Sequence, residues 1–281
     1  MIETGALEAQ LDDPALRVFD CTVVIEFGAD GVAFRSGREA WARAHIPGAG
    51  FLDLLDELAA PHPAFRFMLP SAEQFSEAMS AHGVEDGARV VLYDSQNGSW
   101  AARMWWMLRA YGFDDAVVLD GGWTKWAREA RTTSAAAPNH PRARFIARPR
   151  PGVFVGKEAV LAGIDDSGTC LINGLPETLH RGLGPAVPGR RPGHIPSSEN
   201  VPAESLVDPE TRAFLPEDEL RLLLERAGAL RAEHVITYCG GGIAASGVAF
   251  ALRLLGREDV SVYDASLEEW STDPSLPLEL G

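Results

Sequence analysis

The sequence lacks most features that mark secreted and membrane proteins. It has only three cysteines in 281 residues. A disulfide scaffold needs more cysteines and an even number of them. No run reaches the roughly 18 apolar residues that a membrane-spanning helix requires. The opening residues have neither the basic nor the apolar region of a signal peptide. We therefore expect a soluble, cytoplasmic protein.

Positive charge is also scarce. The chain has 25 Lys and Arg against 40 Asp and Glu, which gives a formal net charge of −15. Such a surface repels phosphate groups, so we expect neither a nucleic-acid nor a membrane partner. A small anionic substrate is still compatible with this charge, because a pocket can be locally positive inside an acidic protein. Histidine and cysteine spacings of the zinc type are missing, so we expect no metal site.

The composition is that of a globular protein, and the chain repeats itself. Residues 89–126 and 234–270 share a series of residues at nearly constant spacing, and His-Ile-Pro occurs at both 45–47 and 194–196. The matching pairs are Tyr93 and Tyr238, Gly112 and Gly256, Asp120 and Asp264, and Trp126 and Trp270. We infer two homologous domains, residues 1–135 and 153–281. The linker, 136–152, is rich in Pro, Arg and Ala and lacks periodicity.

Each half alternates short apolar runs with helical stretches. The runs at 90–93 and 235–238 have the length of strands. Residues 244–255 place apolar side chains on one helical face, and Gly256 ends that helix. Strands joined by crossover helices predict the α/β class, with a mainly parallel sheet flanked by helices in each domain. Ligands of such sheets bind beyond the carboxyl ends of the strands.

The loop after Tyr238 has the strongest chemical signal. Cys239 follows the strand directly, three glycines come next, and a helix begins within the next few residues. Glycines let several N–H groups turn toward one point, and the helix N-terminus adds positive potential there. A sulfur at that point is stabilised as thiolate, the nucleophilic form. The alternative is a buried structural cysteine before a glycine-rich turn, but three consecutive glycines favour a reactive one.

The other two cysteines differ from Cys239. Cys21 and Cys170 lie in strand-like segments without neighbouring glycines. Free cysteine is among the most buried residue types. We predict that both are core residues.

A strand, a cysteine loop and a helix also describe the cysteine phosphatases. Their chemistry requires an arginine that closes the loop and clamps the phosphoryl oxygens with both arms of its guanidinium. Here Ala245 occupies that position, and no Arg or Lys occurs between Cys239 and Arg253. A phosphatase is therefore a remote alternative.

Six motifs in the right order resemble the two-domain rhodanese-like sulfurtransferases, the thiosulfate and 3-mercaptopyruvate enzymes. They are HIPGAGFLDL (45–54), MLPSAEQF (68–75), AARMWWMLRAYG (101–112), VLDGGWTKW (118–126), GHIPSSENVP (193–202) and YDASLEEW (263–270). The resemblance covers nearly the whole chain and implies two tandem rhodanese-like domains. In this family the second domain has a catalytic cysteine at the position of Cys239. The first domain lacks this cysteine, and here Asp94 occupies the matching position of the first repeat.

The resemblance implies a reaction and its site. Cys239 would take a sulfane sulfur from a small anionic donor as a persulfide and pass it to a thiol, cyanide or protein acceptor. No cofactor is needed, because the persulfide holds the sulfur covalently. Arg181 is the best match to a donor-binding arginine, and the protein would be a monomer or weak oligomer. The predicted cradle for the donor and the sulfur consists of Gly240, Gly241, Gly242, Ile243, Ala244 and Ala245.

The chain departs from the family where donors bind. Thiosulfate enzymes have basic residues after the cysteine, and here Gly240 and Gly241 take those places. Mercaptopyruvate enzymes combine a serine with a first-domain histidine and aspartate, and the matching residues here are Gly241, Phe67 and Asp53. The donor is therefore open between 3-mercaptopyruvate and thiosulfate.

Only one of the two donor-binding arginines of the family has a direct match in this chain, namely Arg181. Arg190 or Arg191 would have to replace the second one from a shifted position. This departure and the bare glycine loop leave an alternative from another class. In it the chain is a degenerate rhodanese that carries persulfide for a partner protein and turns over little by itself.

Overall fold

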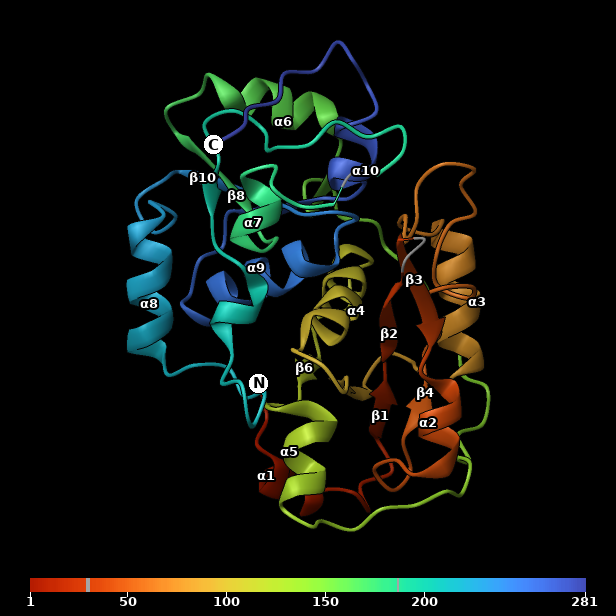
Figure 1. Cartoon of the computed structure of the whole chain (residues 1–281). Helices are drawn as coiled ribbons and strands as arrows, with labels where there is room; N and C mark the ends of the chain where they lie inside the picture. The colour runs from red at the N-terminus through yellow and green to blue at the C-terminus, as the bar shows by residue number, and fades with distance from the viewer. Residues whose placement is uncertain (29–30, 186) are drawn as a thin grey trace. The chain divides into compact units, whose positions relative to one another are not determined.

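The computed structural model describes residues 1–28, 31–185 and 187–281. The chain forms two compact units (Figure 1). Unit 1 comprises Met1–Pro61, Leu69–Arg150 and Glu210–Ala213. Unit 2 comprises His62–Met68, Pro151–Pro209 and Phe214–Gly281. The short segment His62–Met68 thus belongs to the unit that contains Cys239.

Unit 1 is built on a parallel sheet in the order β4-β1-β5-β6. Its strands are β1 (Leu16–Asp20), β4 (Gly50–Phe51), β5 (Arg89–Tyr93) and β6 (Ala116–Val118). Its helices are α1 (Thr4–Glu8), α2 (Arg38–Arg43), α3 (Ala72–Ala81), α4 (Ser99–Ala110) and α5 (Gly122–Arg128). Helix α4 packs on β5 and β6. A separate antiparallel hairpin consists of β2 (Val23–Gly28) and β3 (Gly31–Ser36).

Unit 2 has the same plan, with a parallel sheet in the order β7-β11-β10-β8-β9. Its strands are β7 (Phe154–Val155), β8 (Thr169–Asn173), β9 (Glu199–Asn200), β10 (His234–Tyr238) and β11 (Val260–Tyr263). Its helices are α6 (Lys157–Ile164), α7 (Glu177–His180), the 3₁₀ helix η1 (Ala203–Leu206), α8 (Glu217–Arg226), α9 (Ile243–Leu254) and α10 (Ser266–Trp270). Helix α9 packs on β10, β11 and η1.

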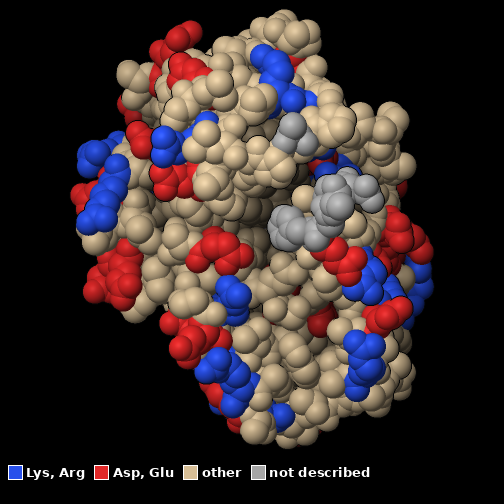
Figure 2. Space-filling model, viewed as in Figure 1, with Lys and Arg blue, Asp and Glu red and all other residues tan. Residues whose placement is uncertain are grey.

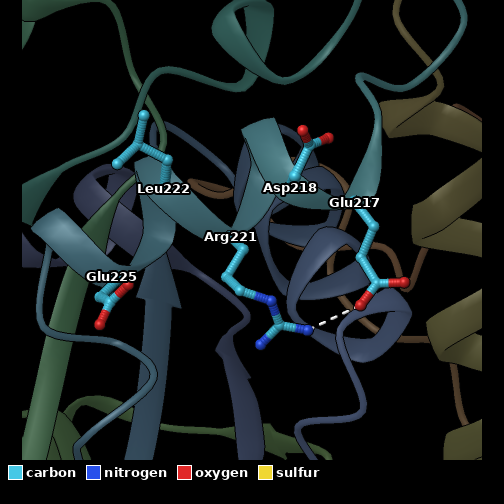
Figure 3. Close-up of a pocket in the computed structure, with 5 residues that line it drawn as sticks. All are labelled: Glu217, Asp218, Arg221, Leu222 and Glu225. Carbon is cyan, nitrogen blue, oxygen red and sulfur yellow. Dashed lines mark hydrogen bonds and ion pairs between the residues drawn. The ribbon is translucent and has the colours of Figure 1, made fainter.

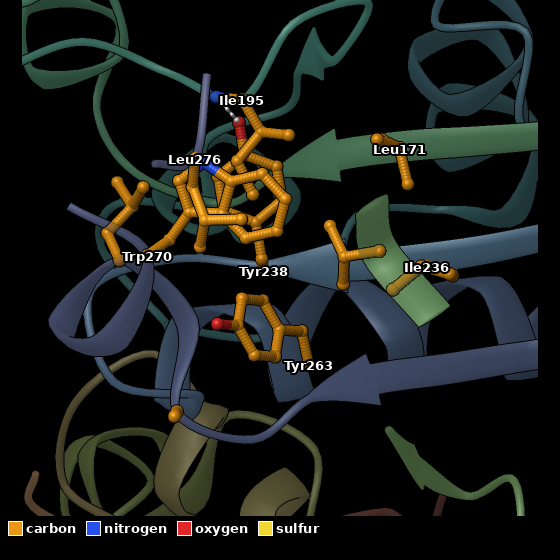
Figure 4. Close-up of a cluster of buried hydrophobic side chains, with 10 residues drawn as sticks. Leu171, Ile195, Ile236, Tyr238, Tyr263, Trp270 and Leu276 are labelled. Atoms are coloured by element: carbon orange, nitrogen blue, oxygen red, sulfur yellow. Dashed lines mark hydrogen bonds between the residues drawn. The ribbon is translucent and has the colours of Figure 1, made fainter. Parts of the chain in front are cut away.

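The core of unit 2 is built around aromatic side chains at the carboxyl ends of its central strands. Tyr238 and Tyr263 are fully buried with Trp270, among leucine and isoleucine side chains from the sheet and the C-terminal segment (Figure 4). The Tyr238 hydroxyl accepts a hydrogen bond from the Ile195 N–H at 3.1 Å. The Trp270 indole donates to the Pro277 carbonyl at 2.8 Å. These bonds satisfy the polar atoms of otherwise apolar rings, which is the usual condition for burying them.

The two units repeat each other down to the backbone of one turn. Gly98 and Gly242 precede α4 and α9, two helices of 12 residues each. Their backbone angles are nearly identical, with φ 78° and ψ −3° for Gly98 and φ 81° and ψ −2° for Gly242. The structure confirms the predicted α/β class, with parallel sheets flanked by helices. Helix α9 begins at Ile243, one residue earlier than the apolar spacing indicates.

Charged side chains of both signs are mixed on the surface. Figure 2 shows lysine and arginine side chains in small groups beside acidic ones on the visible face. Surface ion pairs of unit 1 include Arg142 with Glu77 and Arg148 with Asp86. In the part of the chain that the structure describes, no helix is both long and apolar enough to cross a bilayer.

A buried carboxyl group makes the stability of unit 1 depend on pH. Asp20 ends β1 and is only 6% exposed, and its Oδ1 accepts a hydrogen bond from the Thr22 N–H at 2.8 Å. Burial raises the pKa of Asp20 from 3.8 to about 6. Because the folded state holds this proton more tightly, the contribution of Asp20 to stability is fully present below about pH 4 and lost as the pH rises through 6. The loss amounts to about 3 kcal/mol by pH 7.5.

We expect Asp20→Asn to remove this pH dependence, because the amide keeps the oxygen that accepts from Thr22. Six of the seven tryptophans lie in unit 1, so tryptophan fluorescence during urea unfolding follows mainly this unit. The unfolding midpoint of the parent protein should fall between pH 4.5 and 7.5, and that of the variant should fall less. An equal fall in both proteins would contradict the assignment to Asp20.

Candidate active site at Cys239

The central strand of unit 2 delivers Cys239 to the carboxyl edge of the sheet. Strand β10 lies between β11 and β8 and ends at Tyr238, so Cys239 is the first residue beyond it. Gly242 then adopts a left-handed backbone, φ 81°, and α9 begins at the next residue. Only a residue without Cβ adopts that conformation freely, which explains one of the three glycines. The thiol is free of disulfide bonds, and Cys239 is 2% exposed.

The first turn of α10 holds the Cys239 loop from one side. The Leu267 N–H donates to the Cys239 carbonyl at 3.0 Å, and the Glu268 N–H donates to the Gly240 carbonyl at 2.8 Å. The Ser266 hydroxyl accepts from the Cys239 N–H at 3.1 Å and donates to the Tyr263 carbonyl at 2.8 Å. Ser266 itself has a φ of 52°, which is unfavourable for a residue with a side chain. Its hydrogen bond to the Cys239 N–H helps to offset that strain.

The loop presents a row of backbone N–H groups with no acceptor. Within the described part of the chain, none of the N–H groups of residues 240–245 donates a hydrogen bond to the protein. The first intrahelical bond of α9 comes only from the Ser246 N–H, which donates to the Gly242 carbonyl. Orphan N–H groups at the start of a helix form a natural binding place for an anion. These are the residues that the sequence predicts as the cradle.

Unit 1 shows what the same loop does with a carboxylate. Asp94 follows β5 as Cys239 follows β10, and its side chain turns back into its own loop. One oxygen accepts from the N–H groups of Gln96 and Gly98 at 2.8 and 3.1 Å. The other accepts from those of Trp100 and Ala101, both at 3.0 Å. Burial raises the pKa of Asp94, while these four hydrogen bonds oppose the rise. The turn is therefore an anion cradle that is filled in unit 1.

A buried carboxylate with two arginines adjoins the Cys239 loop. Glu268 is 3% exposed, and its Oε1 accepts from Arg66 Nε at 2.9 Å and Nη2 at 2.6 Å. Oε1 also accepts from Arg190 Nη2 at 2.9 Å, and Oε2 accepts from the Arg66 backbone N–H at 2.7 Å. We refer to Arg66, Arg190 and Glu268 as the Glu268 cluster. Sequence reasoning did not single out Ser266, Glu268 or Arg66.

Gly241 lies next to this cluster with room for a small side chain. A Cβ built on Gly241 would lie 3.5 Å from the Glu268 carboxyl carbon and 3.5 Å from the Phe67 ring, both ordinary contacts. Gly241 is also not among the glycines with positive φ. A Cβ on Gly240 would meet nothing within 4 Å. Of the three glycines, only Gly242 is therefore required by its own backbone conformation.

The three candidate arginines lie in different surroundings. Arg181 ends α7, where its half-exposed side chain pairs with Glu177 at 3.7 Å. The Arg191 guanidinium donates to four carbonyl groups of the C-terminal segment, those of Trp270, Ser271, Asp273 and Leu276. Arg190 contacts Glu268 in the cluster beside the loop. The structure thus ties Arg190, rather than Arg181 or Arg191, to the surroundings of Cys239.

The other two cysteines lie in less reactive surroundings. Cys21 is fully buried, and burial raises the pKa of its thiol strongly. Cys170 is half-buried on β8, where its thiol lies 3.2 Å from the Ala227 carbonyl oxygen. Burial raises the pKa of Cys170 to about 11. Both thiols therefore stay protonated at neutral pH, which disfavours nucleophilic chemistry.

A surface hollow of unit 2 is lined by none of these residues. It runs along α8 and is lined by Glu217, Asp218, Arg221, Leu222 and Glu225 (Figure 3). Arg221 donates to Glu217 at 2.7 Å, one turn away on the same helix. Three carboxylates and a single paired guanidinium would repel an anionic ligand. The hollow shares no residue with the Cys239 loop.

Comparison with known proteins identifies the family of the chain. The Rhodanese-like domain family matches residues 3–129 and 189–273, more than half of the chain. The chain is 31% identical over 276 residues to the 3-mercaptopyruvate sulfurtransferase of Escherichia coli K12, covering 97% of this chain and 95% of that protein. It is 30% identical over 300 residues to thiosulfate/3-mercaptopyruvate sulfurtransferase 2 of Arabidopsis thaliana, covering 99% and 86%. A putative thiosulfate sulfurtransferase of Mycolicibacterium smegmatis is 32% identical over 287 residues, covering 100% and 98%.

Solved structures give the same result. The crystal structure of the 3-mercaptopyruvate sulfotransferase SseA from Escherichia coli matches with a TM-score of 0.83 and 28% identity. The match covers 95% of this chain and 98% of that one. Tum1 from Saccharomyces cerevisiae shares the fold, with a TM-score of 0.83 at 20% identity over 99% and 97% of the two chains. The chain thus belongs to the two-domain rhodanese-like sulfurtransferase family.

Proposed function

We propose that this chain is a sulfurtransferase that moves a sulfane sulfur from a small anionic donor to a thiophilic acceptor through a Cys239 persulfide. The Cys239 thiolate attacks the sulfur that is transferred, which is the outer sulfur of thiosulfate or the thiol sulfur of 3-mercaptopyruvate. The bond between that sulfur and the rest of the donor breaks. Thiosulfate leaves as sulfite with the electron pair. 3-Mercaptopyruvate leaves as pyruvate, whose methyl carbon takes up the proton of the donor's thiol. A thiolate or cyanide then attacks the outer sulfur of the persulfide and releases the Cys239 thiolate.

One observation carries the proposal: among the described residues, the N–H groups of residues 240–245 have no acceptor, and they follow a cysteine at the end of a strand. A thiolate, a persulfide and the departing donor are all anionic, and each needs hydrogen-bond donors in a place from which water is largely removed. Asp94 in unit 1 supports this interpretation, because the same turn there binds a carboxylate through four N–H groups. The proposal needs no cofactor, since the protein itself holds the sulfur.

The donor is proposed only as a class, a small anion such as 3-mercaptopyruvate or thiosulfate. The relatives named above include enzymes for each. Of the three arginines that the sequence offers for the donor, Arg190 contacts Glu268 beside the loop, and Arg181 stays a prediction from the family resemblance. Cyanide, a small thiol or a protein thiol would be the acceptor.

A persulfide carrier for a partner protein is the second candidate. What favours it is the bareness of the loop: Gly240 and Gly241 place no side chain near Cys239, although the structure has room for one at both positions. A carrier would accept one sulfur per chain and turn over little with small acceptors. Steady-state turnover with small donors and cyanide or a thiol separates the two functions.

The first test concerns the nucleophile. Incubation with thiosulfate or 3-mercaptopyruvate should add one sulfur atom to the intact protein, as measured by mass spectrometry. Cys239→Ser should abolish the addition, because the alcohol neither ionises at neutral pH nor forms a persulfide. Cys170→Ser is the matched control and should load sulfur like the parent protein. Sulfur on Cys21 or Cys170, or loading of the Cys239→Ser protein, would show that the nucleophile is misassigned.

A second test separates the roles of the glycines. Gly241→Ser should change the free energy of unfolding by less than about 0.5 kcal/mol, because its Cβ meets only ordinary contacts. Gly242→Ala should lose about 1 kcal/mol or more, because its φ of 81° is unfavourable for alanine. We expect Gly241→Ser to change the ratio of sulfur loading from 3-mercaptopyruvate and thiosulfate, since the hydroxyl would lie beside Glu268, two residues after Cys239 in the loop. Melting temperature and loading rate of both variants provide the comparison. A stability loss at Gly241 as large as at Gly242, with equal losses for both donors, would mean that the loop tolerates no side chain there.

A further inference from the structure

Glu268 is an unusual neighbour for a site that handles anions. Its carboxylate is almost completely buried and lies beside Gly241, two residues after the nucleophile. Its backbone N–H is bonded to the Gly240 carbonyl, which fixes the main chain of Glu268 to the loop, and the two arginines hold its carboxylate in place. The negative charge of Glu268 repels any anion that binds nearby, and the repulsion is strong because solvent screens a buried charge only weakly.

The two arginines more than compensate for this charge. Arg66 directs Nε, Nη2 and its backbone N–H to the Glu268 carboxylate. Arg190 directs only Nη2 to it, and within the described residues its Nε and Nη1 have no acceptor. Two guanidinium groups and one carboxylate leave one net positive charge. That charge lies mainly on Arg190, which can still bind a carboxylate with its free N–H groups.

From this arrangement we infer that Glu268 is a specificity-determining residue, which sets the charge of the donor site to favour a donor with one negative charge. A 2-oxo acid that contains a thiol has a single carboxylate, which matches the one net positive charge of the Glu268 cluster. Thiosulfate has two negative charges, and the second is repelled by Glu268 without a guanidinium to balance it. The inference rests on the proposed sulfur transfer at Cys239 and names the residue that chooses between its donors.

Substitutions that change the charge of the cluster test the inference. Arg66→Gln lowers its net charge to zero, Glu268→Gln raises it to +2, and the double substitution restores +1. Glutamine at 268 keeps an oxygen that accepts from both arginines. Glu269→Gln is the matched control, because its carboxylate lies on the same helix but accepts from Tyr263 instead. For each protein, kcat/KM is measured with thiosulfate and with 3-mercaptopyruvate and a common acceptor.

The ratio of kcat/KM for thiosulfate to that for 3-mercaptopyruvate should follow the charge. We expect about a tenfold rise for Glu268→Gln and about a tenfold fall for Arg66→Gln, mainly through KM for thiosulfate. The double variant and Glu269→Gln should keep the parent ratio. Added salt should reduce the differences. If Glu268→Gln or Arg66→Gln fails to fold, the other single variant still tests the inference, because each has its own expected direction of change in the ratio.

The inference would be overturned if the ratio of the two kcat/KM values did not change with the net charge of the Glu268 cluster. It would also be overturned if Glu269→Gln changed this ratio as much as Glu268→Gln does. Failure of the proposed function gives a different result, namely a parent protein that loads no sulfur on Cys239. In that case the same proteins are tested by alkylation of Cys239 with iodoacetamide in the presence of pyruvate or sulfate. Sulfate should protect better in Glu268→Gln and worse in Arg66→Gln, while protection by pyruvate changes less. Equal protection in all variants would again contradict the role of Glu268.

Discussion

The hydrogen bonds between the first turn of α10 and the Cys239 loop are the constraint on which the site depends. They bind the carbonyl groups of Cys239 and Gly240 from one side, and the N–H groups of residues 240–245 have no acceptor in the described structure. Unit 1 contains the same bond, from the Trp123 N–H to the Asp94 carbonyl at 3.0 Å. A turn held in this way at the end of a central strand collects N–H groups at one point, whether the residue there is a cysteine or an aspartate.

The same constraint explains an unfavourable backbone conformation that occurs at the same place in both units. Gly122 and Ser266 begin α5 and α10 with φ values of 51° and 52°. At Gly122 a Cβ would lie 2.2 Å from the Asp94 carbonyl oxygen, so only glycine fits. Unit 2 accepts a serine there, and its hydroxyl bonds the Cys239 N–H. Unit 2 thus tolerates the strain of a side chain at this position and gains a hydrogen bond to the backbone of Cys239.

The sequence predicts the parts of this structure that local pattern and repetition determine. Apolar runs and glycines predict the α/β class and the cysteine loop, because each is visible within a few dozen residues, while the internal repeat indicates two domains and six motifs carry the family resemblance. The Glu268 cluster depends on Arg66, which lies about 200 positions before Glu268 in the chain. No local sequence pattern predicts a contact over such a separation. Glu268 itself could have been noticed, because the repeat aligns it with Thr124 of unit 1, where no charge is present. Arg190 lies in an aperiodic loop, where only the fold decides which arginine approaches the site.

The two units solve the same electrostatic problem in different ways. A ring of unpaired N–H groups at a helix N-terminus is a fixed positive potential that attracts an anion. Unit 1 satisfies it permanently with the Asp94 carboxylate, and its cradle has no room for chemistry. Unit 2 places its carboxylate beside the loop instead, held by Arg66 and Arg190, and in the described structure the N–H groups of residues 240–245 stay without an acceptor. Glu268 then balances part of the charge that the two arginines bring, and one net positive charge is left beside a loop whose N–H groups are not already bound to a carboxylate.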